Sequence, residues 1–188
     1  MSSLPSYYIS PEEYLAIERR AECKSEYVDG VLYAMAGGSE RHNLIAGNLI
    51  AELNLQLRKV PCRVYPSDLK VRVPNSQRFF YPDVSIVCGE TQFADDERDV
   101  VLNPVVVVEV LSESTAAFDR GKKFQSYQQI ESLQEYLLVS QDEYVVEHYL
   151  RQEDRHWLYL KVSGLEEAIA LPTIKCQLAM RDIYSKTT

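Results

Sequence analysis

Pro104-Val-Val-Val-Val-Glu-Val-Leu-Ser112 combines a run of valines with a single charged residue, Glu109. A short run so rich in β-branched residues, opened by a proline, predicts a β-strand that is buried on both faces. Side chains alternate along a strand, so we expect Val106, Val108 and Val110 to lie on the face opposite to Glu109. A buried carboxylate without a partner costs several kcal/mol. Glu109 should therefore be paired, protonated or bound to a cation.

A second apolar run, Phe79-Phe-Tyr-Pro-Asp-Val-Ser-Ile-Val-Cys88, carries Asp83 and predicts another buried strand. If the two strands are neighbours, Asp83 and Glu109 can share a divalent cation such as Mg²⁺, which prefers oxygen ligands and keeps bound waters. Such a cation makes a nucleophile from water and stabilises charge on a phosphoryl oxygen. A nearby ammonium would complete a hydrolytic site by orienting water or neutralising developing charge. These two carboxylates are the first candidates for a catalytic centre.

Length and composition predict one globular domain over residues 1–188, since the chain has 188 residues and is 46% hydrophobic. No apolar run approaches the roughly 18 residues that a membrane span needs, so we expect no membrane association. The segment Met1–Tyr8 lacks the regions of a signal peptide, which favours a cytoplasmic location. The net charge of −8 weighs against a generic nucleic-acid binder but leaves room for a local basic groove.

The cysteines are Cys23, Cys62, Cys88 and Cys176, which are far apart and show no C-x-x-C spacing. This pattern favours buried free thiols in a reducing cytosol over a disulfide framework or a zinc site.

The order of predicted elements indicates an α+β chain with one central mixed β-sheet. A capping box at Ser10 opens the first helix, and Asp29-Gly30 marks a hairpin turn with Glu26 on the strand before it. The predicted elements are a helix over 11–20, the hairpin over 24–35, a helix over 40–59, strands over 62–65 and 69–73, the Asp83 strand, an exposed loop over 89–103, the Glu109 strand, a helix containing 118–130, a buried strand over 135–140, an exposed hairpin over 144–162 and a helical turn over 179–184.

Several motifs occur in a fixed order along the chain: Glu26-Tyr-Val-Asp-Gly30, His42, Pro82-Asp83, Glu109-Val-Leu-Ser112-x-x-Thr115, Asp119-x-x-x-Lys123-x-x-x-Tyr127 and Glu135-Tyr136. This ordered set resembles the PD-(D/E)xK nuclease superfamily. More closely, it resembles the Uma family of predicted restriction endonucleases, a domain family of unknown function. The resemblance extends from the region of Pro11 to that of Leu150. It implies a restriction-endonuclease-like core, with a central mixed β-sheet flanked by helices and an additional β-hairpin.

The resemblance also implies a metal centre. Asp83 and Glu109 match the two metal-binding carboxylates of the family, and the carbonyl of Val110 matches a further ligand. The implied cofactor is Mg²⁺, with Mn²⁺ as an alternative.

The catalytic lysine departs from the superfamily pattern. It usually stands two residues after the glutamate, where this chain has Leu111. Lys123 matches the family's helical lysine instead, and Lys122 is the second choice, about 100° around the helix. Glu26 matches an acidic residue that adds a metal ligand or a contact to water.

We therefore expect a Mg²⁺-dependent endonuclease that acts on DNA as a homodimer, with RNA as a second substrate class. One alternative is a catalytically inactive nuclease-fold protein with a binding or structural role, in which Glu109 forms a buried salt bridge to Lys123 or an arginine. Another is a glycosidase that uses Asp83 and Glu109 as acid and base. We expect His42 to be a capping or packing histidine, and Ser112 and Thr115 to cap the next helix.

Overall fold

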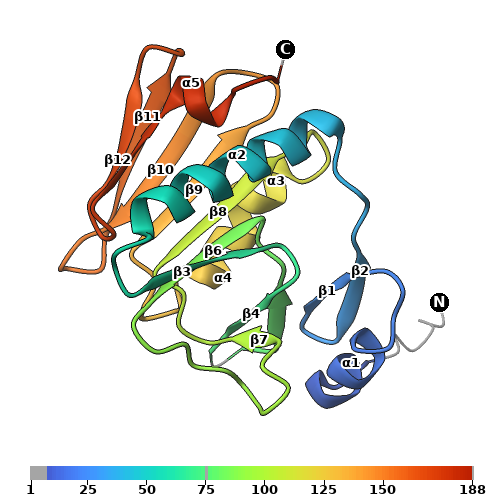
Figure 1. Cartoon of the computed structure of the whole chain (residues 1–188). Helices are drawn as coiled ribbons and strands as arrows, with labels where there is room; N and C mark the ends of the chain where they lie inside the picture. Colours follow the sequence, from blue (N-terminus) through green and yellow to red (C-terminus); the bar gives the residue numbers. More distant parts are fainter. Residues whose placement is uncertain (1–7, 75, 188) are drawn as a thin grey trace.

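The computed structural model describes residues 8–74 and 76–187, so the expectation for Met1–Tyr8 falls almost wholly outside the described residues. The fold is mixed α+β, as predicted (Figure 1). A six-stranded sheet has the order β11 (Trp157–Ser163), β10 (Val145–Arg151), β9 (Glu135–Ser140), β8 (Val106–Leu111), β6 (Val84–Cys88) and β3 (Cys62–Pro66). It is a mixed sheet because β8 runs parallel to β9 and antiparallel to β6.

The remaining strands form two further sheets beside this mixed sheet. A five-stranded sheet has the order β2 (Val31–Ala34), β1 (Ser25–Val28), β5 (Arg78–Phe80), β4 (Lys70–Val73) and β7 (Val100–Val101). A small sheet pairs β12 (Ala168–Leu171) with β13 (Cys176–Ala179), a hairpin that the sequence pattern did not predict. The helical elements are α1 (Pro11–Glu18), α2 (Glu40–Leu57), α3 (Ala116–Phe118), the π-helix η1 (Asp119–Lys123), α4 (Phe124–Tyr127) and α5 (Met180–Ile183).

The two faces of β8 are buried against different partners. Val106, Val108 and Val110 lie in one core cluster with the apolar stripe of α2, which contains Ile45 and Leu49. Residues of the other face pack in a second cluster that contains Val107, Leu111, Phe124, Tyr127 and Tyr136. The predicted division of the valine run is therefore confirmed. Leu111 stands at the position of the superfamily's usual lysine, and its side chain is part of this second core.

Asp83 does not lie inside a continuous strand, which corrects the prediction of one strand from Phe79 to Cys88. The chain leaves the five-stranded sheet after β5, bends at Asp83, and enters the six-stranded sheet as β6. Pro82 has no backbone N–H to donate to a strand ladder, which favours an interruption at this point. The Pro82-Asp83 step is thus the crossover between the two large sheets.

The predicted exposed loop over 89–103 is also partly wrong. Its last residues form β7, whose Val100 and Val101 are fully buried. They pair in parallel with β4, a contact that local polarity cannot reveal.

Two of the four cysteines form a disulfide, which contradicts the prediction of free thiols. The antiparallel register of β3 and β6 places Cys62 opposite Cys88, with 3.9 Å between their Cα atoms. Cys23 and Cys176 are free, and only Cys176 is buried. Disulfides are rare in cytosolic proteins, so the cysteines no longer support the cytoplasmic location, which stays a prediction. No helix in the described ranges is long and apolar enough to cross a bilayer.

Candidate active site

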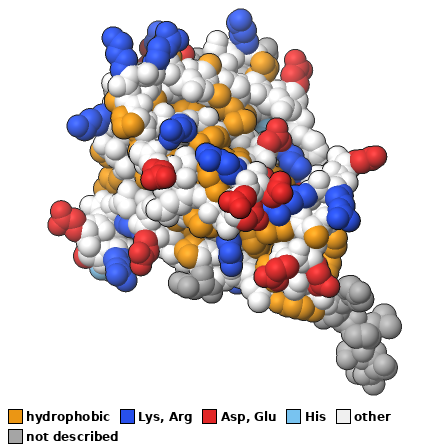
Figure 2. Space-filling view, turned by 60° about the horizontal axis from the view of Figure 1, so that its bottom comes forward, with side chains coloured by type: hydrophobic (Ala, Val, Ile, Leu, Met, Phe, Trp, Pro, Cys, Tyr) orange, Lys and Arg blue, Asp and Glu red, His pale blue; other side chains and the backbone are white. Residues whose placement is uncertain are grey.

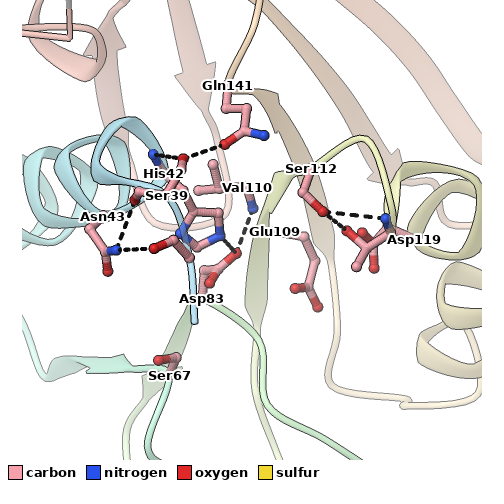
Figure 3. Close-up of polar contacts among 12 residues, drawn as sticks. Ser39, His42, Asn43, Ser67, Asp83, Glu109, Val110, Ser112, Asp119 and Gln141 are labelled. Carbon is pink, nitrogen blue, oxygen red and sulfur yellow. Dashed lines mark hydrogen bonds and ion pairs between the residues drawn. The ribbon is translucent and has the colours of Figure 1, made fainter. Parts of the chain in front are cut away.

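Asp83 and Glu109 come next after the last pair of the β6–β8 ladder. That pair is Val84 with Val108, so Asp83 directly precedes β6 and Glu109 directly follows Val108 on β8. Asp83 Oδ2 also accepts a hydrogen bond of 2.7 Å from the backbone N–H of Val110, which fixes the bend onto β8 (Figure 3). The carboxylate of Asp83 therefore contacts the backbone of the residue after Glu109, whereas the carboxylate of Glu109 contacts Lys123 and Tyr127.

Lys123 reaches Glu109 from the helical segment that follows β8. Its Nζ lies 2.9 Å from Glu109 Oε1, 2.9 Å from Glu26 Oε1 and 3.6 Å from Asp119 Oδ1. The side chains of Lys123 and Glu109 are only 6% and 5% exposed. Lys122, by contrast, is exposed and forms no ion pair with the described residues. Of the two lysines considered from sequence, Lys123 is the one that the fold brings to the carboxylates.

A π-helix places Lys123. The residues from Asp119 to Lys123 form η1 instead of the regular α-helix that the spacing by four predicted. A π-turn inserts an extra residue per turn and is frequent at functional sites. The six-stranded sheet stabilises η1, because the hydroxyl of Tyr136 on β9 donates a hydrogen bond of 3.1 Å to the Asp119 carbonyl. Tyr127, one turn further along, donates to Glu109 Oε1 at 3.1 Å.

Glu26 joins the cluster from the other large sheet. It lies on β1, the strand that leads into the hairpin turn at Asp29 and Gly30. Both turn residues have positive φ angles, 49° and 97°. Besides its contact with Lys123, its Oε1 accepts a hydrogen bond of 3.2 Å from the backbone N–H of Tyr81. The hairpin that the Asp29-Gly30 signal predicted is therefore what delivers this carboxylate.

Lys123 is surrounded by three carboxylates, those of Glu109, Glu26 and Asp119. Burial raises the pKa of Glu109 well above its ordinary value, and Lys123 opposes this shift. Burial likewise raises the pKa of Asp119. Burial alone would lower the pKa of Lys123, but Glu109, Glu26 and Asp119 together raise it well above its ordinary value. Lys123 therefore stays charged, and the excess of carboxylates favours uptake of a further proton or cation.

His42 is the site residue that sequence reasoning missed. Ser39 is the N-cap of α2, and its hydroxyl accepts a hydrogen bond of 3.1 Å from the backbone N–H of His42, so His42 is not itself the capping residue. Its ring Nε2, however, lies 3.2 Å from Asp83 Oδ2 (Figure 3). The hydrogen bond to Asp83 raises the pKa of His42. Its place in the ordered motif set was the signal that pointed to this contact.

The donor set fits a hard cation that keeps its waters. Hydrogen bonds and ion pairs from the described residues engage Asp83 Oδ2 and Glu109 Oε1, and none reaches the second oxygen of either carboxylate. Within residues 8–74 and 76–187, no three His, Cys, Asp or Glu side chains form a metal-binding group by themselves. Mg²⁺ commonly binds through one or two carboxylates together with waters and substrate phosphates. Asp83 and Glu109 each keep one oxygen available as a ligand of this kind.

Comparison with known proteins identifies the class. A crystal structure described as "a putative nuclease belonging to DUF820 from Anabaena variabilis ATCC 29413" superposes with a TM-score of 0.79, covering 96% of this chain and 99% of that chain. The two sequences are 16% identical, so the likeness establishes a shared fold alone. The fold is therefore nuclease-like.

Sequence relatives place the chain more narrowly. The model of the Uma2 family, described as "Putative restriction endonuclease", matches residues 11–181, and the chain belongs to this family. Two proteins of Synechocystis sp. (strain ATCC 27184 / PCC 6803 / Kazusa) are similar. "Uncharacterized protein sll1609" is 38% identical over 89% of this chain and 94% of its own length, and "Uncharacterized protein slr1290" is 39% identical over 97% and 94%.

Proposed function

We propose that this protein is a Mg²⁺-dependent endonuclease that hydrolyses phosphodiester bonds in DNA, with a centre of the PD-(D/E)xK type. The observation that carries the proposal is the buried ammonium of Lys123, 2.9 Å from both Glu109 and Glu26, with Asp83 bonded to the backbone N–H of Val110, the residue after Glu109. The Uma2 family and the nuclease-like fold support the same reaction class.

The cation would be held by Asp83, Glu109 and the carbonyl of Val110. When bound, Mg²⁺, or Mn²⁺ in its place, supplies activation of a water and stabilisation of charge on the phosphoryl oxygens. His42 and the backbone N–H of Val110 hold Asp83 in position from two directions. These two contacts orient the carboxylate of Asp83 before the substrate binds.

Lys123 supplies positive charge at the point where the phosphate gains negative charge. Hydrolysis adds water to phosphorus and breaks the bond to the leaving oxygen, with charge developing on the phosphoryl oxygens. A preorganised ammonium in a dry site stabilises that charge more strongly than it would in water. Glu26 and Asp119 keep Lys123 protonated and oriented, which assigns Glu26 a supporting place in the catalytic group.

Surface charge restricts how DNA is bound. Lys and Arg side chains are intermixed with Asp and Glu on the face shown in Figure 2, and they form no continuous basic surface there. With a net charge of −8, broad neutralisation of DNA phosphates is not available to this chain. Binding should therefore depend on local contacts near the site and should be weak at high salt.

We further propose that the protein acts as a homodimer. β11 is an edge strand of the six-stranded sheet, and its Leu158, Tyr159 and Leu160 are 45%, 48% and 43% exposed. An edge strand with exposed apolar side chains is suited to pair with a second strand. Light scattering of the purified chain tests this, with Leu158→Lys expected to yield monomers.

The test of the function is cleavage of supercoiled plasmid by the purified full chain with Mg²⁺ or Mn²⁺. We expect nicked and linear products, their loss on chelation, and their loss in Asp83→Asn and Glu109→Gln. Glu153→Gln, which alters an exposed carboxylate of the β10–β11 turn, is the matched control and should cleave normally.

Absence of cleavage by the unaltered chain with either metal, together with calorimetric metal binding that Asp83→Ala leaves unchanged, would refute the proposal. The ion pairs of Lys123 would then be structural, and the protein would be an inactive nuclease-fold protein.

A further inference from the structure

An open cleft of about 450 Å³ lies between β2 and the η1–α4 segment. Its lining includes Val31, Tyr33, Arg78, Phe80, Phe118 and Lys122. The volume falls within the roughly 300–1,000 Å³ of small-molecule sites. The cleft thus has the size of a site for one nucleotide or a similar group.

Three structural links connect this cleft to the proposed catalytic centre. Tyr33 on β2 is the register partner of Glu26 on β1, so their side chains lie on the same face of the hairpin. Lys122 precedes Lys123 in η1. The ring of Phe80, part of the cleft lining, lies 5.5 Å from the ammonium of Lys123. The cleft therefore adjoins the residues that surround Lys123 and Glu26.

The cleft presents an exposed aromatic side chain, Tyr33, that belongs to none of the core clusters. Tyr33 is 55% exposed and Val31 is 46% exposed, although both face the same way as Glu26. Phe118 contributes a second ring, packed edge-to-face against buried Phe80. Exposed aromatic side chains beside a nucleic-acid site offer a stacking surface for bases, and every base has a face that can stack.

One free cation accompanies this surface. Arg78 is already neutralised, because its guanidinium pairs with Asp29 at 2.6 Å and donates to Ser126 at 2.8 Å. Lys122 is exposed and has no ion-pair partner among the described residues. A single ammonium beside a stacking surface fits the phosphate and the base of one nucleotide.

A larger cleft of about 750 Å³ is a weaker candidate. Its lining includes Arg72, Gln92, Leu102 and Ile130, and no aromatic side chain on which a base could stack. It lies near the start of β8, whereas Glu109 lies toward the strand's other end.

We propose that the cleft between β2 and η1–α4 binds an unpaired nucleotide next to the scissile phosphate, with Tyr33 stacking on the base and Lys122 contacting the adjoining phosphate. The inference rests on the proposed function and adds a substrate preference to it. The favoured substrate is single-stranded DNA, or a junction or flap in which one base is unstacked.

The test measures binding without hydrolysis. The full chain is titrated, with chelator present, into a single-stranded oligodeoxynucleotide that carries 2-aminopurine, whose fluorescence is quenched by stacking, and anisotropy reports affinity. We expect Tyr33→Ala to weaken binding roughly 5- to 100-fold and to abolish the quenching, and Tyr33→Phe to preserve both. Lys122→Ala should lower the slope of log affinity against log salt by about 0.7. Leu55→Ala and Lys59→Ala, exposed near the end of α2 and just after it, are the controls and should bind normally.

Several outcomes would overturn the inference: no binding by the unaltered chain, unchanged quenching and affinity in Tyr33→Ala, or a change of oligomeric state in that variant in place of a change in binding. Failure of the proposed function looks different. Normal binding that depends on Tyr33, without metal-dependent cleavage, would refute catalysis and leave the nucleotide site intact. Cleavage of single strands that Tyr33→Ala leaves unchanged would refute the nucleotide site alone.

Discussion

The ammonium of Lys123 lies 2.9 Å from Oε1 of Glu109, and both side chains are almost fully buried. Glu26, from the other large sheet, lies at the same distance from this ammonium. One lysine therefore neutralises carboxylates from two sheets that share no strand. Its loss should affect both the proposed chemistry and the stability of the fold.

Lys123→Met should lower the free energy of unfolding by about 3–5 kcal/mol, because Glu109 and Glu26 would be buried without a counter-charge. Urea denaturation measures this. Adding Glu109→Gln to Lys123→Met should restore part of the loss, since one uncompensated charge is removed. Lys122→Met, at the exposed neighbour, should change stability by no more than about 0.5 kcal/mol. Equal stability of Lys123→Met and Lys122→Met would contradict the buried ion pairs.

Gly38→Ala should displace His42 and reduce the proposed metal-dependent cleavage. A Cβ atom at Gly38 would lie 2.6 Å from Nδ1 of the His42 ring, so the ring would have to move from Asp83. We expect the Mg²⁺ concentration for half-maximal cleavage to rise several-fold, because side chains that hydrogen-bond to a metal ligand typically contribute about 10–100-fold to metal affinity or activity. Gly37→Ala is the control, since a Cβ there meets no atom within 4 Å. Identical titrations of both variants would show that His42 does not position Asp83.

Asp99 should make stability depend on pH in the acid range. Hydrogen bonds from Arg19, together with Lys70, lower the pKa of Asp99 from 3.8 to about 2, against the effect of burial. The unfolded chain binds this proton first as the pH falls, so the stabilisation is complete above about pH 4 and is lost toward pH 2. Because solvent screens the group, we expect a contribution of about 1 kcal/mol.

The measurement compares the unfolding free energy of the unaltered chain and Asp99→Asn at several pH values. The difference between them should shrink as the pH falls from about 4 to about 2. A difference that stays constant over this range would show that Asp99 does not titrate with a lowered pKa.

The Cys62–Cys88 disulfide should stabilise the chain by about 3 kcal/mol, as expected from loop-closure entropy for a separation of 26 residues. Cys88→Ser should therefore unfold at lower urea concentration than the unaltered chain, and a reducing agent should lower the unaltered chain to the same midpoint. Cys23→Ser, at an exposed free thiol, should have no effect in either condition. Unchanged stability on reduction would indicate that the two thiols are not linked in solution.

Much of the site was predictable because its local signals are strong. Glu109 is the only charged residue in a buried valine run, and Asp29-Gly30 predicts the hairpin that carries Glu26. The predicted family and fold class are confirmed. The contacts join Glu109, Lys123 and Glu26. The catalytic roles of these three residues and of Asp83 stay predictions.

The missed features depend on contacts between distant segments. Cys62 and Cys88 meet through the register of β3 and β6, and β7 forms because β4 offers it a parallel edge. The π-turn at Asp119 replaces the regular helix where the hydroxyl of Tyr136 reaches its carbonyl from β9. None of these contacts produces a periodic pattern of apolar residues within one local stretch of sequence.

The sequence by itself determined which stretches are buried, where the hairpin turns, and which carboxylate must find a partner, because burial and backbone preference are local properties of residue type. Only the tertiary structure decided that Asp83 lies at the crossover between two sheets and that Lys123, not Lys122, reaches Glu109 and Glu26. It also decided that Tyr33 lies opposite Glu26 in the hairpin. Those outcomes depend on strand register and helix phase, and a shift of one residue in either would direct a different side chain to the site.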